Sequence, residues 1–233
     1  FAELRMVKTA EELDAMRRAV DVAERAFLLW APTLKAGVSE KVAAASLVAE
    51  LLGSGADSLA FDPIVASGPN AGLPHATPSH RRFEQGDWIV VDWGAKVDGY
   101  VSDLTRMVVI GSPQGPLEGV HEIVLLANRA GRDVLRRGIA AEDVDTAART
   151  VISDAGYGQH FVHRTGHGFG LEAHEPPYII TGNRQPLEPG MTFAVPPGIS
   201  LEGVGGVRIE DAVTITDRGG ETLTTLDRTP FAV

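Results

Sequence analysis

An internal repeat at a constant offset of 104 residues constrains the fold of this chain more than any other feature. Residues 84–94 (EQGDWIVVDWG) line up without a gap with residues 188–198 (EPGMTFAVPPG). Gly37 and Gly138, each followed by a β-branched residue, pair at an offset of 101, which differs only by small gaps. Chance similarity is the alternative for so short a match. A duplication predicts two related halves that pack as one pseudo-symmetric domain.

Each half begins with the pattern of two helices. Thr9 and Glu12 form a capping box ahead of apolar residues at helical spacing. Glycines mark the ends of the later helices, as Gly138 does in the second half. Four helices are therefore expected, over residues 10–34, 41–52, 118–137 and 142–155.

A long β-hairpin is predicted after the first pair of helices, because Asp98-Gly99 separates the apolar runs 88–91 and 107–110. If these two residues form the loop, Asp92 faces Thr105 across the hairpin. With strands following in the second half too, the fold class is α+β, built from two helix-helix-hairpin halves.

Two aspartates of this hairpin are the first candidates for chemistry. The register places Asp92 and Asp103 on the same face as diagonal neighbours, roughly 7 to 8 Å apart at Cα, where they could share cations. A solvated face is the alternative, but Asp is disfavoured in strands and Asp92 interrupts an apolar run. The repeat matches the strand of Glu210 to that of Asp103, so carboxylates from both halves are expected to converge.

Histidines are concentrated in the second half. Four of the seven lie within residues 160–174, around a glycine-rich sequence that would let His167 approach a ligand closely. A surface or structural role is the usual reading of a lone histidine. Together with the carboxylates, however, these imidazoles make a mixed donor set that suits Mn, Co, Zn or Fe.

Composition excludes other classes of function. The formal charge of −10 and the lack of a Lys/Arg-rich run predict that the protein binds neither nucleic acid nor an anionic membrane. The longest apolar stretches fall far short of the roughly 20 residues that span a bilayer. The absence of cysteine excludes thiolate metal sites and is compatible with a reducing compartment.

The motifs together resemble the creatinase/methionine aminopeptidase superfamily, the "pita-bread" metallopeptidases, and most closely the Xaa-Pro branch of prolidase and aminopeptidase P. The resemblance rests on the aspartate hairpin (91–94 and 102–106), the histidine segment (166–177) and two later segments (187–191 and 207–211). It covers the chain from about Arg5 to Thr225. It implies a linker at 1–8 that follows an absent N-terminal domain, and one catalytic domain over 9–233.

The resemblance also implies a dinuclear metal centre of Mn, Co or Zn. Carried over, its five ligands would be Asp92, Asp103, His167, position 196 and Glu210. Position 196 is a proline, which has no side-chain donor atom, so at most four protein ligands remain. The repeat agrees, because it places Pro196 opposite Asp92. An impaired site with one ion or two is expected.

Further roles follow from the same resemblance. His75, His163 and His174 would be catalytic, and Arg208 would bind substrate. The substrates would be small Xaa-Pro peptides, cleaved at the amide bond before proline. A cytoplasmic location and a homodimer are also expected.

Two alternatives stay open. Pro196 is compatible with a metal-free pseudoenzyme that uses the cleft for binding. The retained His75 and His174 are compatible with a metal-independent C–N hydrolase like creatinase, although such an enzyme would not need Asp92, Asp103 and Glu210.

Overall fold

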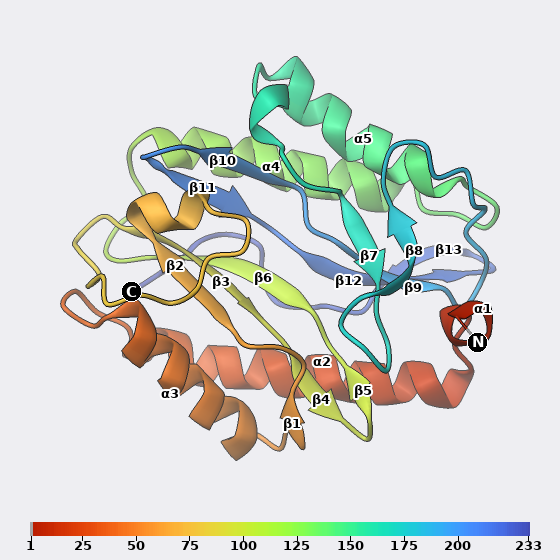
Figure 1. The fold of residues 1–233 in the computed structure, drawn as a ribbon, viewed down its shortest axis with the longest axis horizontal. Helices are drawn as coiled ribbons and strands as arrows, with labels where there is room; N and C mark the ends of the chain where they lie inside the picture. Colours follow the sequence, from red (N-terminus) through yellow and green to blue (C-terminus); the bar gives the residue numbers. More distant parts are fainter. Residues whose placement is uncertain (1) are drawn as a thin grey trace.

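The protein is described by a computed structural model that covers residues 2–233. Figure 1 shows two pairs of helices on opposite sides of the strands, and the chain is α+β as predicted. The helices are α1 (Ala2–Met6), α2 (Ala10–Trp30), α3 (Glu40–Gly53), α4 (Pro116–Asp133) and α5 (Ala141–Asp154), with 3-10 turns η1 (Ala31–Thr33), η2 (Gly68–Gly72) and η3 (Gly158–His160).

Two larger sheets correspond to the two halves. Each contains an antiparallel pair of strands, and these pairs begin 104 residues apart, at Trp88 and at Thr192. The first sheet has the order β14-β6-β3-β2, with β2 (Ile64–Ser67), β3 (Trp88–Trp93), β6 (Leu104–Val109) and β14 (Phe231–Ala232). The second has the order β13-β12-β9-β7-β8, with β7 (Gly166–Gly168), β8 (Glu175–Ile179), β9 (Thr192–Val195), β12 (Asp211–Thr216) and β13 (Gly219–Thr222).

Smaller sheets continue the hairpins beyond these strands. One has the order β1-β4-β5 and the other pairs β10 with β11. Their bounds are β1 (Ser58–Leu59), β4 (Ala95–Val97), β5 (Tyr100–Val101), β10 (Gly198–Leu201) and β11 (Gly205–Arg208).

The hairpin register is as predicted, because Asp92 pairs with Thr105 and Val97 pairs with Tyr100. Between these pairs the hairpin is interrupted at Gly94. A Cβ atom there would lie 2.0 Å from the carbonyl oxygen of Ser102, so only glycine fits. Asp103 lies at this interruption, between β5 and β6.

Two predicted helix ends are wrong. The helix expected over 10–34 ends at Trp30 and continues as η1, because Pro32 has no N–H to donate. The helix expected over 118–137 ends at Asp133. Its next turn is replaced by a tertiary contact, in which the carbonyl of Leu135 accepts a hydrogen bond from Gly220 of β13.

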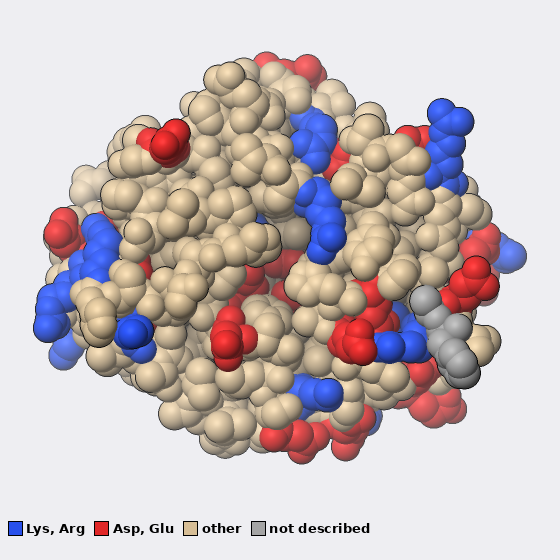
Figure 2. All heavy atoms as spheres, in the orientation of Figure 1, with Lys and Arg blue, Asp and Glu red and all other residues tan. Residues whose placement is uncertain are grey.

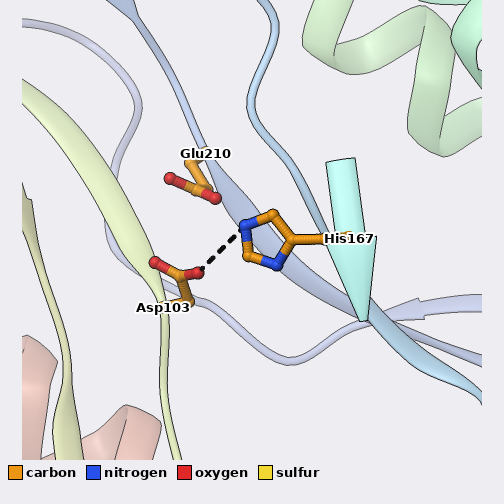
Figure 3. A group of neighbouring side chains, drawn as sticks. All are labelled: Asp103, His167 and Glu210. Atoms are coloured by element: carbon orange, nitrogen blue, oxygen red, sulfur yellow. Dashed lines mark ion pairs between the residues drawn. The ribbon is translucent and has the colours of Figure 1, made fainter. Parts of the chain in front are cut away.

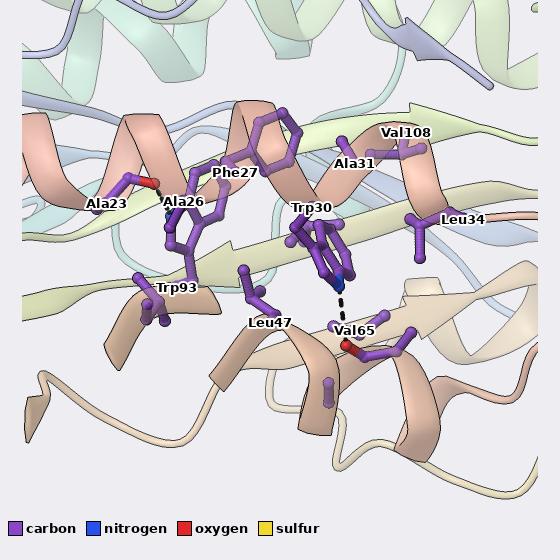
Figure 4. Packing of buried hydrophobic residues seen from close by; sticks show 14 of the residues in the cluster. Ala23, Ala26, Phe27, Trp30, Ala31, Leu34, Leu47, Val65, Trp93 and Val108 are labelled. Atoms are coloured by element: carbon purple, nitrogen blue, oxygen red, sulfur yellow. Dashed lines mark hydrogen bonds between the residues drawn. The ribbon is translucent and has the colours of Figure 1, made fainter. Parts of the chain in front are cut away.

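The first sheet is buried on both faces. Ile89, Val91 and Trp93 face α2 and α3, where Trp93 stacks on Phe27 with 4.5 Å between ring centroids (Figure 4). Trp88 and Val90 face the cluster formed with α4 and α5. Because strand side chains alternate, Asp92 shares this second face, which leads toward the centre of the molecule.

The halves meet at strands β6 and β12. A single β-bridge links Thr105 to Glu210, and the backbone N–H of Glu210 donates to the carbonyl of Thr105 at 3.1 Å. The chain segments that carry Asp103 and Glu210 are therefore joined directly.

Candidate metal centre

Three predicted ligands from the two halves converge at this junction. Asp103, His167 and Glu210 each offer a donor atom, and these atoms all lie within 4.8 Å of one another. All three side chains are buried, and Nε2 of His167 lies 3.7 Å from Oδ2 of Asp103. Figure 3 shows the two carboxylates and the imidazole directed toward a common point. Oxygen and imidazole donors from both halves therefore lie together at one place.

The glycines around His167 allow its strand to fit between its neighbours. A Cβ atom on Gly166 would lie 2.0 Å from the carbonyl oxygen of Ala194, and one on Gly168 would lie 2.2 Å from that of Pro176. Both contacts are impossible for a side chain, so the Gly-His-Gly sequence of β7 is a packing requirement. The ring is oriented by Nδ1, which lies 3.1 Å from the carbonyl oxygen of Gly168, so Nε2 faces the carboxylates.

Burial and mutual repulsion change the proton affinities of this cluster. The pKa of Asp103 is raised well above its ordinary value, mainly by burial and next by the charges of Glu210 and Asp92. The pKa of Glu210 is raised to about 8, mainly by burial and next by the charge of Asp92. The pKa of His167 is lowered to about 3, mainly by burial and next by the charge of His174. A neutral imidazole beside carboxylates that repel one another is a donor set that a cation stabilises.

Asp92 lies beside this cluster and is held by an arginine. Its Oδ2 accepts a hydrogen bond from Nη2 of Arg208 at 2.7 Å, and both side chains are largely buried. Its Oδ1 is buried and has no hydrogen-bond partner among the described residues. This orphaned oxygen is available to a cation.

Pro196 directly follows β9 and lines the same cleft, at the place that the repeat pairs with Asp92. It presents ring carbons where a fifth donor would stand. The residues present therefore fit a divalent ion held by Asp103, His167 and Glu210, with Asp92 adjacent. Of the five donors that the resemblance implies, the one at position 196 is absent, because proline has no side-chain donor atom.

A cleft of about 460 Å³ opens onto this cluster. Figure 2 shows acidic atoms recessed in a hollow near the middle of the face. All the predicted site residues line it, including His75, His163, His174 and Arg208. The rings of His167 and His174 lie 4.1 Å apart between centroids.

Several residues of the site were missed in the sequence. Thr105 donates from Oγ1 to Oε2 of Glu210 at 2.6 Å, and the predicted register, which placed it opposite Asp92, was an available signal. Phe61, Ile64 and Pro74 form an apolar part of the cleft wall. No motif in the sequence points to Phe61 or Ile64, whereas Pro74 directly precedes the predicted His75.

Comparison with known proteins identifies the family. The family model described as metallopeptidase family M24 matches residues 14–217. This chain belongs to metallopeptidase family M24. The membership agrees with the buried Asp/His/Glu cluster, since this metallopeptidase family is dependent on divalent metal.

Relatives of this M24 chain include Xaa-Pro dipeptidases. The one from Pyrococcus furiosus is 39% identical over 226 residues, which cover 97% of this chain and 65% of the relative. The one from Lactobacillus delbrueckii subsp. lactis is 39% identical over 94% of this chain and 60% of the relative. The chain thus spans less than two thirds of the length of these relatives.

Solved structures agree on the fold. The X-Pro aminopeptidase from Thermotoga maritima superposes with a TM-score of 0.98 at 43% identity, over 100% of this chain and 66% of that one. The prolidase from Pyrococcus furiosus gives 0.95 at 39% identity, over 97% and 67%. The predicted pita-bread fold is confirmed. In residues 2–233, no helix is both long and apolar enough to cross a bilayer.

Proposed function

We propose that this chain is the catalytic part of a metal-dependent Xaa-Pro peptidase, which hydrolyses the amide bond before proline in small peptides. The observation that carries the proposal is the convergence of Asp103, His167 and Glu210 at the floor of a cleft. The names of the relatives support the substrate class. A homodimer and a cytoplasmic location stay predictions.

The metal centre would hold one ion tightly, between Asp103, His167 and Glu210. A divalent ion in such a centre supplies Lewis acidity to the scissile carbonyl and lowers the pKa of water. Thr105 keeps Glu210 oriented through its 2.6 Å hydrogen bond. Because Pro196 contributes no donor, a second ion would be held more weakly.

The remaining cleft residues would bind and orient the peptide. His75 and His174 are exposed on the cleft wall and can hydrogen-bond a substrate without losing an internal partner. Burial lowers the pKa of His163 to about 4, so that its ring is neutral at pH 7. Arg208 stays paired with Asp92 at the floor, while Phe61, Ile64 and Pro74 offer apolar surface that suits a proline ring.

The test is hydrolysis of Ala-Pro and of longer Xaa-Pro peptides with added Mn²⁺, Co²⁺ or Zn²⁺. Each assay is matched with an EDTA control and with the corresponding Xaa-Ala peptide. We expect turnover that requires metal and favours proline. Turnover no higher than in EDTA would reject the peptidase.

Pro196 favours a second candidate, a metal-free protein that keeps the cleft for binding. Metal analysis of protein purified without chelator separates the two. The peptidase proposal predicts about one retained ion per chain, and the binding protein predicts none.

A further inference from the structure

Among the buried carboxylates outside the metal centre, two share the same arrangement, one in each half. Glu40 is at the start of α3 and Asp145 is in α5, and both are 0% exposed. Each accepts hydrogen bonds from hydroxyl groups at the two ends of one chain segment. Both of these segments carry histidines that line the cleft.

Glu40 closes the segment 67–79 at both ends. Its Oε1 accepts from the backbone N–H and the Oγ of Ser67, both at 2.7 Å. Its Oε2 accepts from the N–H of Ser79 at 2.9 Å and from its Oγ at 2.7 Å. Asn70 donates to both oxygens from between them, at 3.2 and 3.1 Å. His75 lies within the segment that these bonds enclose.

Asp145 closes the segment 165–181 in the same manner. Oγ1 of Thr165 donates to its Oδ1 at 2.5 Å, and Oγ1 of Thr181 donates to its Oδ2 at 2.8 Å. Arg149 donates to both oxygens, at 2.9 and 3.1 Å. His167 and His174 both lie between the two threonines.

We call each buried carboxylate, with the chain segment that it closes, a clamp. In the clamp of Asp145, Arg149 also holds the segment of a third histidine, His163. It donates to the carbonyl of Phe161 at 3.0 Å and to that of His163 at 3.1 Å. The histidine segments of the second half are thereby fixed to one face of α5.

Both carboxylates are ionised in these positions. Burial alone would raise the pKa of Glu40, but hydrogen bonds from Ser79 and Ser67 outweigh it and lower the pKa. Burial opposes the same change at Asp145, where Arg149, Thr165 and Thr181 lower the pKa. The negative charge strengthens each bond, since bonds to an ionised acceptor are about twice as strong as neutral ones.

We propose that Glu40 and Asp145 are positioning residues that hold the cleft histidines of the two halves. Glu40 fixes the segment of His75, which is outside the metal cluster. Asp145 fixes the segment of His167, which is inside it. Only the effect on turnover rests on the proposed function, because the effect on metal binding does not require any peptide to be cleaved.

Amide substitutions test the clamps while keeping their shape. In Glu40→Gln, one oxygen becomes an NH₂ group that faces the backbone N–H of Ser67 or of Ser79, and neither can accept a hydrogen bond. In Asp145→Asn, the NH₂ group faces N–H groups of Arg149 in the same way. Thr165→Val is a milder variant, because it deletes one bond and leaves the Asp145–Arg149 ion pair.

Glu24→Gln is the matched control. Glu24 is also buried and accepts three hydrogen bonds, from the N–H and Oγ1 of Thr225 and from the N–H of Leu226. Neither Thr225 nor Leu226 lines the cleft. The control therefore loosens a buried clamp that holds no cleft histidine.

The deciding measurements are Mn²⁺ affinity by calorimetry and amide hydrogen exchange of the two segments. Glu40→Gln should speed exchange within 67–79, leave Mn²⁺ affinity within about twofold, and lower kcat about tenfold. Asp145→Asn and Thr165→Val should speed exchange within 165–181 and weaken Mn²⁺ affinity about tenfold, the lower end of the range for groups that orient a metal ligand. Glu24→Gln should change neither Mn²⁺ affinity nor kcat.

Equal losses of Mn²⁺ affinity in Glu40→Gln, Asp145→Asn and Glu24→Gln would overturn the proposal, because they would show general destabilisation. Unchanged affinity in Asp145→Asn and Thr165→Val would also overturn it. If the unsubstituted protein cleaves no Xaa-Pro peptide, the proposed function fails. Mn²⁺ affinity and amide hydrogen exchange then still show whether Glu40 and Asp145 hold the histidine segments.

Discussion

Arg106 on β6 and Asp211 on β12 hold equivalent positions in the two halves and form an ion pair, with 2.8 Å between Nη2 and Oδ1. Their equivalence follows from the register, since Arg106 is opposite Val91 and Asp211 is opposite Val195, 104 residues later. Both side chains are fully buried. Arg106 also donates to the carbonyl of Glu210 at 2.7 Å, so the pair joins the halves beside the metal cluster.

Arg106→Met is expected to destabilise the protein strongly. The change removes a buried cation and leaves four backbone carbonyls without this donor, among them those of Thr105 and Leu226. Breaking a buried pair from one side typically costs about 3–5 kcal/mol. Urea unfolding with EDTA present measures the loss. Asp211 keeps Arg228 and Arg132 as ion-pair partners and also accepts a hydrogen bond from Thr224, so adding Asp211→Leu should lower the stability further instead of restoring it. A loss below about 1 kcal/mol in Arg106→Met would contradict a structural role for the pair.

The metal-free protein should become less stable as the pH rises from 6.5 to 8. Burial and Asp92 hold the pKa of Glu210 at about 8, against 4.5 in the unfolded chain, so the folded state keeps a proton that the unfolded state has lost. Below pH 6.5 the lowered pKa values of His163 and His167 have the opposite effect, because there they make the folded state more stable as the pH rises. Each retained proton contributes at most about 1.4 kcal/mol per pH unit.

Unfolding in EDTA across this pH range tests the prediction. Glu210→Gln should reduce the slope of the profile, because the amide has no proton to lose, and saturating Mn²⁺ should reduce it too. A stability that stays level or rises with pH in the unsubstituted protein would contradict the raised pKa of Glu210.

Metal binding near pH 7 should release protons. The pKa of Glu210 is raised to about 8, so this group holds its proton until a cation displaces it, and the pKa of Asp103 is raised in the same direction. Mn²⁺ titration calorimetry in buffers of different ionisation enthalpy counts the protons released. We expect a release that falls in Glu210→Gln, and binding heats that are independent of the buffer would contradict the raised pKa of Glu210.

Pro196→Glu is expected to restore a missing donor. Pro196 lines the cleft beside the cluster, so a carboxylate there would raise the number of bound ions from one toward two and increase kcat. Pro196→Gln, which has nearly the same shape without the charge, is the control. If Glu and Gln give the same metal content, the lost carboxylate is not what limits the site.

Local patterns in the sequence predicted much of this fold. The Asp98-Gly99 turn fixed the hairpin register, which placed Asp92 opposite Thr105 as found. The capping box of Thr9 and Glu12 is present at the start of α2. The repeat led to Glu210, which as a single carboxylate in a strand pattern is weak evidence by itself.

Features that depend on long-range contacts could not be predicted. The end of α4 is set by Gly220 of β13, whose N–H donates a hydrogen bond to the carbonyl of Leu135. The ion pair of Asp92 with Arg208 joins strands from different halves. Glu40 and Asp145 gave no sequence signal, because the hydroxyl groups that they bind lie 20 to 39 residues away and form no motif. Only Arg149, four residues after Asp145, is a local partner.

Equilibrium dialysis against Mn²⁺, with metal analysis of the retained protein, tests most directly whether the two halves build one cation site. Asp103→Asn alters the first half, Glu210→Gln the second, and exposed Glu118→Gln is the control. We expect about one tightly held ion per chain, lost on either cluster substitution and kept by the control. No retained ion, or retention equal in all three variants, would contradict this expectation.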